Sequence, residues 1–264
     1  MPGPATHTLR ILSCNILAGA SIQRYRQYVT RSWASVLPSR AKLDNLDSLA
    51  RTLPDFDIVG LQETDAGSLR SGFRNQTRYL AETAGMPFWS HQPNRKMARL
   101  AYSANGMISR IEPHQVLDYP LPGRGRGALM ARFGTTENAL VVVIAHLSLG
   151  PQARERQLQF IAELLAGCRH VILMGDLNSE PDSPEMRLLF RRTHLLPPAQ
   201  AMATFPSWRP RRAIDHILLS SGLRMRRQWT LPHAFSDHLP LAAEVELPQS
   251  LLADSQTQRV DPDA

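Results

Sequence analysis

The sequence predicts an α/β protein in which two mixed sheets pack together and helices cover their outer faces. Apolar runs rich in β-branched residues recur eight times, at 9–14, 57–62, 105–109, 127–133, 139–147, 171–175, 214–219 and 240–247. Their lengths are typical of strands. The stretch 139–145 is apolar without interruption, which favours a strand covered on both faces. Amphipathic segments between the runs supply the helices.

Each helix is indicated by its pattern and its ends. Residues 40–53 carry a leucine stripe after Ser39, a suitable N-cap. Pro151 suits the first position of a helix over 152–166, and Gly167 suits its stop. We expect two further helices, at 74–84 and just after Pro184.

The remaining segments are expected to be loops at a rim. Segments 20–38, 90–103 and 197–212 are irregular and rich in arginine. We see no linker that would divide the chain, so we expect one catalytic domain over 1–248. The residues 249–264 form a polar tail that we expect to be disordered.

Composition limits the classes of function. The chain has 264 residues, 43% of them hydrophobic, and a net charge of +7, which suits one sizeable core. All basic residues except Lys42 and Lys96 are arginines. This excess indicates affinity for phosphate groups, or a compositional bias with no function. No apolar stretch reaches 18 residues and no secretory signal begins the chain, so we expect a cytoplasmic monomer without a transmembrane segment.

Short polar motifs end the apolar runs, or lie within them, at five places. Buried carboxylates are costly unless they pair or bind a cation, so five such places predict one shared site. The polar residues are Asn15, Glu63, Asp176 with Asn178, Asp215, and Asp237 with His238.

The residue types indicate a hard cation. Neither cysteine has zinc-like spacing, and oxygen ligands favour Mg²⁺ or Mn²⁺. Glu63 is the ligand candidate, with Asn15 as a neutral oxygen ligand or an orienting group; the alternative for Glu63 is an exposed acid at a strand end. Asp176 and Asn178 would face the same way on an extended segment, although Gly-Asp-x-Asn is also typical of a turn.

Two histidines complete the candidate set. An aspartate such as Asp215 would fix the tautomer of His238 and raise its proton affinity, and the resulting cation would stabilise charge on a phosphate. His146 ends the longest apolar run. The alternative for His146 is a core residue bonded to backbone.

Taken together, the ordered motifs resemble the endonuclease/exonuclease/phosphatase superfamily of Mg²⁺-dependent phosphoester hydrolases, over residues 10 to 248. The order is Asn, Gln-Glu, His-Leu, Gly-Asp-x-Asn, Ile-Asp-His-Ile and Ser-Asp-His. The resemblance implies a four-layer α/β/β/α sandwich and in-line attack of a metal-assisted water on phosphorus.

The resemblance also implies roles for single residues. It places Asn15 and Glu63 at the metal with Asp237 nearby, and makes Asp176 the group that orients the water. Phosphate contacts fall to Asn178 and His146, the Asp–His pair to Asp215 and His238, and substrate binding to Asn105 and Arg126. His216 departs from the family pattern, which has Tyr in many members, and this difference should affect the pocket wall.

Several substrates remain open. We expect a phosphodiesterase, and the positive charge favours a nucleic acid, with Trp33, Trp89 and Trp208 as candidates for stacking on bases. A phospholipid head group or inositol phosphate is the second alternative, as in the sphingomyelinase-like and glycolipid-anchor-remodelling branches. A small phosphoester is the third. A catalytically inactive binding module is the hypothesis outside enzymology.

Overall fold

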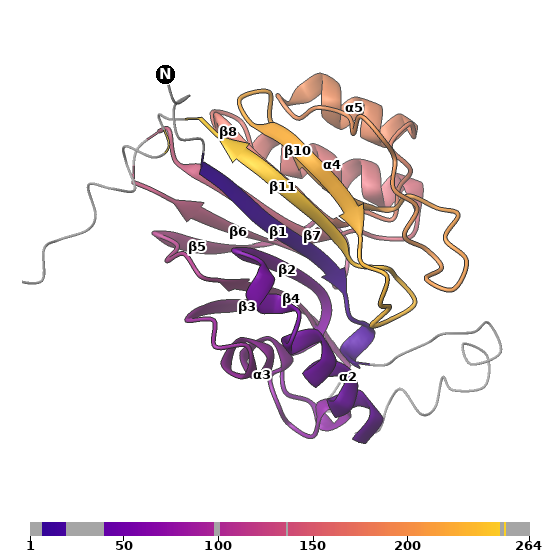
Figure 1. Cartoon of the computed structure of the whole chain (residues 1–264). Helices are drawn as coiled ribbons and strands as arrows, with labels where there is room; N and C mark the ends of the chain where they lie inside the picture. The colour runs from indigo at the N-terminus through magenta and orange to yellow at the C-terminus, as the bar shows by residue number, and fades with distance from the viewer. Residues whose placement is uncertain (1–6, 20–39, 98–100, 136, 249–250, 252–264) are drawn as a thin grey trace, which may run out of the picture.

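In a computed structural model of the chain, described for residues 7–19, 40–97, 101–135, 137–248 and 251, two sheets stack face to face (Figure 1). One has six strands in the order β10-β11-β1-β2-β4-β3, and the other five in the order β5-β6-β7-β8-β9. The strands of the first sheet are β1 (His7–Asn15), β2 (Ile58–Asp65), β3 (Phe88–Met97), β4 (Ala101–Ser109), β10 (Arg224–Thr230) and β11 (Leu241–Leu247). Those of the second are β5 (Gln115–Pro120), β6 (Gly127–Phe133), β7 (Leu140–His146), β8 (His170–Asp176) and β9 (Asp215–Leu219).

Helices cover the outer face of each sheet, which confirms the four-layer α/β/β/α sandwich. Helices α2 (Arg40–Ala50) and α3 (Gln76–Thr83) pack on the six-stranded sheet. Helices α4 (Pro151–Leu164) and α5 (Pro184–Arg192) pack on the five-stranded sheet. Three-residue 3₁₀ turns lie at Leu17–Gly19, Leu53–Asp55 and Leu69–Ser71. None of the helices in the described ranges is long and apolar enough to cross a membrane.

Three apolar clusters follow from this layering. One lies between the sheets and joins residues such as Ile11, Ile144 and Ile217. The other two lie under the helix pairs, one on each sheet. Every residue of β7 and β8 is buried, as the uninterrupted apolar run of 139–145 predicted, because a sheet inside a four-layer sandwich is covered on both faces.

All eight expected strands are present, but three more were missed. The prediction that 90–103 is a loop is wrong: residues 90–97 belong to β3 and 101–103 to β4, while 98–100 lie outside the described residues. The segments 115–120 and 224–230 also form strands. These three missed strands, β3, β5 and β10, are all at sheet edges, where one side meets water and the apolar signal is weak.

The predicted helices are present, but they end a few residues earlier than expected. Pro151 is the first residue of α4, as expected, and Gly167 follows its end with a φ of 83°. Segment 197–212 contains no named helix or strand. The basic segment 20–38, the N-cap Ser39 and the tail apart from Leu251 lie outside the described residues.

The order of the strands brings their polar ends to one edge. Strands β1 and β2 run parallel, and so do β7 and β8, so their carboxyl ends lie at the same edge of each sheet. Strand β9 is antiparallel to β8 and begins there with Asp215. Strand β11 is antiparallel to β1, so the segment that leads into it, with His238, reaches the same edge.

Candidate active site

The two sheets each contribute side chains to a single polar cluster at this edge. Asn15 on β1 donates from Nδ2 to Oδ2 of Asp176 on β8, at 3.1 Å, and to Oε1 of Glu63 on β2, at 3.4 Å. Nε2 of His146 on β7 lies 3.5 Å from Oδ2 of Asp176 and 3.7 Å from Oε1 of Glu63. Asn15 and Asp176, which are 161 positions apart in the sequence, thus meet across the sheet interface.

The backbone is held in an uncommon conformation at two of the predicted site residues, Glu63 and Asn178. Glu63 has a φ of 56° and lies where the pairing of β2 with β4 shifts register. Asn178 has a φ of 52°. Positive φ is uncommon for residues other than glycine and gathers at functional sites. The bulge in β2 turns the Glu63 side chain out of the regular alternation and toward the second sheet.

Gly175 allows the two central strands to approach at this edge. Its φ is 142°, and a Cβ placed on it would lie 1.9 Å from the carbonyl oxygen of Ala145 on β7. A side chain here would push β8 away from β7 and separate Asp176 from His146. The glycine of the Gly-Asp-x-Asn motif therefore positions the aspartate, because no larger residue fits.

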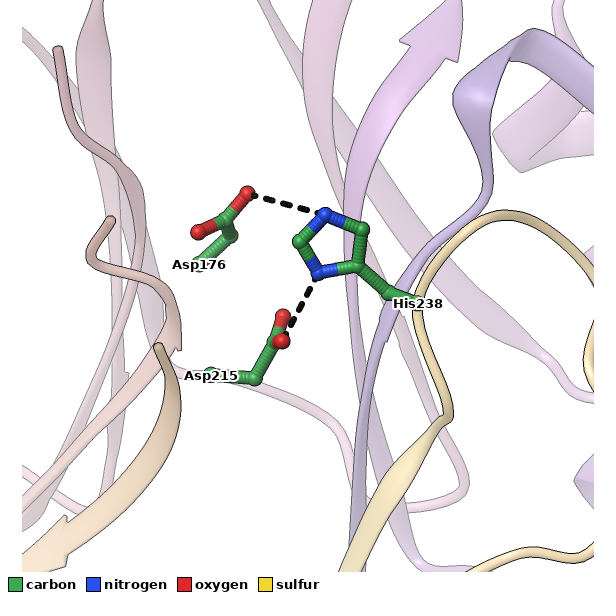
Figure 2. Close-up of side chains that lie close together, drawn as sticks. All are labelled: Asp176, Asp215 and His238. Carbon is green, nitrogen blue, oxygen red and sulfur yellow. Dashed lines mark hydrogen bonds and ion pairs between the residues drawn. The ribbon is translucent and has the colours of Figure 1, made fainter. Parts of the chain in front are cut away.

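Asp215 and His238 form the expected pair, and Figure 2 shows His238 lying between two carboxylates. Nδ1 of His238 is 2.8 Å from Oδ2 of Asp215, and its Nε2 is 3.8 Å from Oδ2 of Asp176. Thr204 also donates to Oδ2 of Asp215, at 2.5 Å. The ring of Phe205 packs on that of His238, with centroids 4.9 Å apart.

This arrangement favours the imidazolium. Burial of His238 disfavours its charge, but Asp215, Asp176 and Asp237 outweigh burial and raise its pKa to about 10. Burial and the neighbouring Asp215 raise the pKa of Asp176 to about 7, although the His238 cation opposes them. His238 is therefore a fixed cationic donor at neutral pH, and Asp176 can exchange a proton there.

His146, in contrast to His238, is neutral. Nη1 of Arg126 lies 2.9 Å from its Nδ1, and a guanidinium can only donate, so Nδ1 accepts and the proton is on Nε2. Burial, Arg126 and His238 hold the pKa of His146 well below its usual range. The neutral ring thus directs its N–H toward the carboxylates of Glu63 and Asp176.

The carboxylates form a donor set that suits a hard cation. Asp176, Asp215 and His238 place ligand atoms within 4.8 Å of one another, but both nitrogens of His238 already face carboxylates. Burial and then Asp237 raise the pKa of Glu63, and burial raises that of Asp237 as well. Two mutually repelling carboxylates beside Asp176 would be stabilised by a divalent ion.

Three predicted site residues are placed in ways the sequence did not indicate. Asn15 turns its amide nitrogen toward the carboxylates, while its Oδ1 accepts from the backbone N–H of Leu17. Asn178 donates its amide to the carbonyl of Leu147, and its backbone N–H donates to Oδ1 of Asp176. Asn105 is fully buried.

The Asn105 amide ties the two sheets together. Its Nδ2 donates to the carbonyl of Gly127 at 2.8 Å and to Oε1 of Gln92 at 3.3 Å. Gln92 in turn donates to the carbonyls of Tyr119 and Ala128. The structure thus places Asn105 inside the sheet interface, bonded to backbone carbonyls, and contact with a substrate stays a prediction.

His216 also lies beneath the site. It is buried, and its Nε2 is 2.7 Å from the carbonyl of Ser179. Ser179 also donates to Oε1 of Glu185 at 2.8 Å, and Arg154 pairs with that same oxygen. His216 therefore supports the loop that carries Asn178, in place of the pocket wall expected for it.

Two further residues support the site and were not among the predicted site residues. Thr204 is buried eleven positions before Asp215 in a segment expected to be a loop. Ser236 donates to the backbone carbonyl of Asn15 and accepts from the backbone N–H of His238, at 3.0 Å for the latter. A hydroxyl next to an Asp-His dipeptide could have indicated Ser236, but nothing in the sequence relates Thr204 to Asp215.

Solved structures with the same architecture include enzymes of different kinds. A protein of the endonuclease/exonuclease/phosphatase group from Beutenbergia cavernae is 18% identical, with a TM-score of 0.68 over 91% of this chain and 72% of that one. Mannosyl-6-phosphatase from Bacteroides thetaiotaomicron is 17% identical (TM-score 0.63; 90% and 99%). The human Nocturnin catalytic domain is 16% identical (TM-score 0.64; 90% and 94%). At these identities the likeness shows the fold alone.

Sequence comparison supplies the family. No curated protein matches the chain significantly. The model of the Endonuclease/Exonuclease/phosphatase family matches residues 12–238, a span that begins before Asn15 and ends at His238, so it contains every residue of the cluster. Since the match covers most of the chain and the fold agrees with it, this protein belongs to the endonuclease/exonuclease/phosphatase family.

Proposed function

We propose that the protein is a metal-dependent phosphodiesterase that hydrolyses its substrate by in-line attack of water. Family members are phosphoester hydrolases. The observation that supports this chemistry here is the buried His238, held between Asp215 and Asp176 beside the carboxylates of Glu63 and Asp237. A fixed cation next to acids with raised pKa values suits proton transfer and charge stabilisation on a phosphate.

Each residue then has a defined task. Asp176, with a pKa of about 7, accepts a hydrogen bond from the attacking water and takes its proton near neutral pH. His238 donates from Nε2 to a non-bridging phosphate oxygen, while Asp215 and Thr204 hold its ring. His146 offers the N–H of its Nε2 to the same region, and Arg126 fixes that tautomer.

Glu63 would hold the divalent ion, with Asp237 beside it, because burial raises the pKa of both carboxyl groups and the charge of Asp237 raises that of Glu63 further. Mg²⁺ or Mn²⁺ at this position supplies positive charge to the phosphate and the leaving oxygen. The Asn15 amide keeps Glu63 and Asp176 at a fixed separation.

The charge of the site favours a diester over a monoester. Four carboxyl groups, Glu63, Asp176, Asp215 and Asp237, surround the cations His238 and Arg126. Together with the divalent ion these groups carry no excess of positive charge, so the second negative charge of a monoester dianion would gain no attraction over the single charge of a diester.

The test is hydrolysis of bis-p-nitrophenyl phosphate and p-nitrophenyl phosphate with and without Mg²⁺ or Mn²⁺. We expect metal-dependent turnover of the diester and a loss of several orders of magnitude in Glu63→Gln. Glu82→Gln is the matched control, since Glu82 is an exposed acid on α3 that pairs with Arg78. Preference for the monoester would identify a phosphatase, and metal binding without turnover of either ester would support the inactive binding module.

A further inference from the structure

Two large apolar side chains are unusually exposed in loops at the edge of the sheets that carries the candidate site. Five large hydrophobic residues are exposed in the described ranges, and the two most exposed are Phe73, at 67%, and Leu149, at 76%. Phe73 lies in the loop after β2, and Leu149 lies three residues after the end of β7. The ends of these two strands meet, since Glu63 and His146 are 3.7 Å apart.

The other three exposed apolar residues lie at the opposite end of the sheets. Trp89 pairs in register with Ile108, near the start of β2, and Ile111 follows the end of β4. Leu196 donates from its backbone to Leu219, at the end of β9 that is remote from Asp215. These three are 36 to 50% exposed. The strongest exposure of apolar surface therefore coincides with the site edge.

The loop that presents Phe73 is held rigidly in a costly conformation. The carboxylate of Asp65, fully buried, accepts from the backbone N–H groups of Gly67 and Ser68 and from the hydroxyls of Ser68 and Ser71, at 2.6 to 2.9 Å. Phe73 has a φ of 61°, which is unfavourable for a bulky residue. Asparagine or glycine would fit this backbone better and would be better hydrated, so Phe73 indicates a contact.

The loop of Leu149 is fixed as well. The backbone N–H of Ser148 donates to Oε1 of Gln157 at 2.9 Å, and Arg154 donates to the carbonyl of Leu149. The two apolar side chains therefore project from ordered loops that follow strands of different sheets, at the edge where β2 and β7 end.

Exposed arginines lie in the loops of the same edge. Arg74 follows Phe73, and Arg124 lies in the loop between β5 and β6 that also carries the His146 partner Arg126. Arg209 and Arg211 are exposed in the segment tied to the site by the Ser207 N–H, which donates to the carbonyl of Asp237 at 2.7 Å. This edge, called the mouth below, thus combines the exposed side chains of Phe73 and Leu149 with these exposed arginines.

We propose that this mouth docks on an anionic lipid surface, with Phe73 and Leu149 inserted among the lipids and the arginines on the head groups. The inference rests on the proposed function and narrows its substrate to phosphodiesters presented at a membrane. Arginines alone would equally suit nucleic acid, but an aliphatic side chain such as Leu149 offers no stacking surface for bases. An apolar tip beside cationic groups is the combination that binds an anionic bilayer interface.

The test is co-sedimentation of the full chain with phosphatidylcholine vesicles, with and without phosphatidylserine. We expect binding to the anionic vesicles, lowered roughly tenfold or more by each of Phe73→Asn and Leu149→Ser. Asparagine tolerates the φ of Phe73, so that variant should fold at least as well. Leu196→Ser is the matched control, since it removes an exposed leucine from the opposite end.

Sedimentation requires no turnover, so this result and the proposed function can fail separately. Hydrolysis of soluble bis-p-nitrophenyl phosphate should be unchanged in Phe73→Asn and Leu149→Ser. Absence of vesicle binding, or binding that these two variants leave intact, would overturn the docking proposal. The proposal would also be overturned if the protein did not bind vesicles but bound single-stranded DNA through Phe73 and Leu149.

Discussion

Replacing Asp215 with asparagine should remove the charge that keeps His238 protonated while leaving its geometry nearly intact. Oδ2 of Asp215 accepts from Nδ1 of His238 and from Thr204 Oγ1, and an asparagine oxygen can occupy the same position. The difference between a pKa of 6.5 and one of about 10 corresponds to about 5 kcal/mol in favour of the imidazolium.

The size of the fall in the pKa of His238 depends on the charges that remain around it in Asp215→Asn. Asp176 and Asp237 still raise the pKa of His238, whereas burial lowers it. We expect that pKa to fall well below about 10, since the charge and hydrogen bond of Asp215 are the largest favourable contributions. Loss of a cationic donor aimed at the phosphate should then lower turnover about 10²- to 10³-fold.

The assay is an NMR titration of the His238 ring together with the pH dependence of diester hydrolysis. Thr204→Val is the matched variant: it removes one hydrogen bond to Asp215, at a cost of about 2 kcal/mol, but keeps the carboxylate. It should lower the free energy of unfolding and leave the pKa of His238 near its original value. A His238 pKa that stays near 10 in Asp215→Asn, or turnover within threefold of the original, would refute the reasoning.

Four further predictions concern turnover against pH, stability against pH, packing at Gly175 and metal binding. Turnover should rise with pH through about 7, as Asp176 loses its proton, and decline toward pH 10, as His238 loses its own. Without metal, the free energy of unfolding should fall as pH rises, because the pKa values of Asp176 and His238 in the folded protein exceed their ordinary values. The loss due to Asp176 occurs between pH 3.8 and about 7, and the loss due to His238 between pH 6.5 and about 10. Chemical denaturation at several pH values measures this change. Gly175→Ala should cost roughly 3 kcal/mol or more, because its Cβ would overlap a carbonyl oxygen, whereas Gly150→Ala, with open space around it, should change the melting temperature little. Mg²⁺ or Mn²⁺ should raise the melting temperature of the original chain but not that of Glu63→Gln, and an equal rise in both would exclude Glu63 as the principal ligand.

The fold could be predicted where burial leaves a strong pattern. Strands such as β7 and β8 are covered on both faces and are apolar throughout, so their sequences indicate strands without help from neighbours. Strand β10, with the sequence Arg-Met-Arg-Arg-Gln-Trp-Thr, lies at an edge and is half exposed. Its pairing with β11 determines its conformation, and that pairing is not encoded in its own residues.

The site could be predicted as a set of residues but not as a set of contacts. Asp176, Asp215 and His238 meet because each lies at a strand end or leads into a strand, and such positions are visible in the sequence. The direction of an amide is not visible: Asn15 presents its nitrogen to the carboxylates, and Asn105 binds backbone carbonyls. Thr204 was missed because its relation to Asp215 exists only after the chain turns back on itself.

The strained backbone at the site is explained by its position between two sheets. A regular strand would continue the alternation of β2 through Glu63. The φ of 56° at Glu63 and the shifted pairing with β4 take its side chain out of that alternation, and its carboxylate meets Asn15 of the same sheet and His146 of the second sheet. Such a conformation costs of order 1–3 kcal/mol, and the fully buried β2 residues before it, from Ile58 to Gln62, supply the packing that maintains it. The rigid sandwich therefore fixes a carboxylate where water and a cation can reach it, at an edge that neither sheet could form alone.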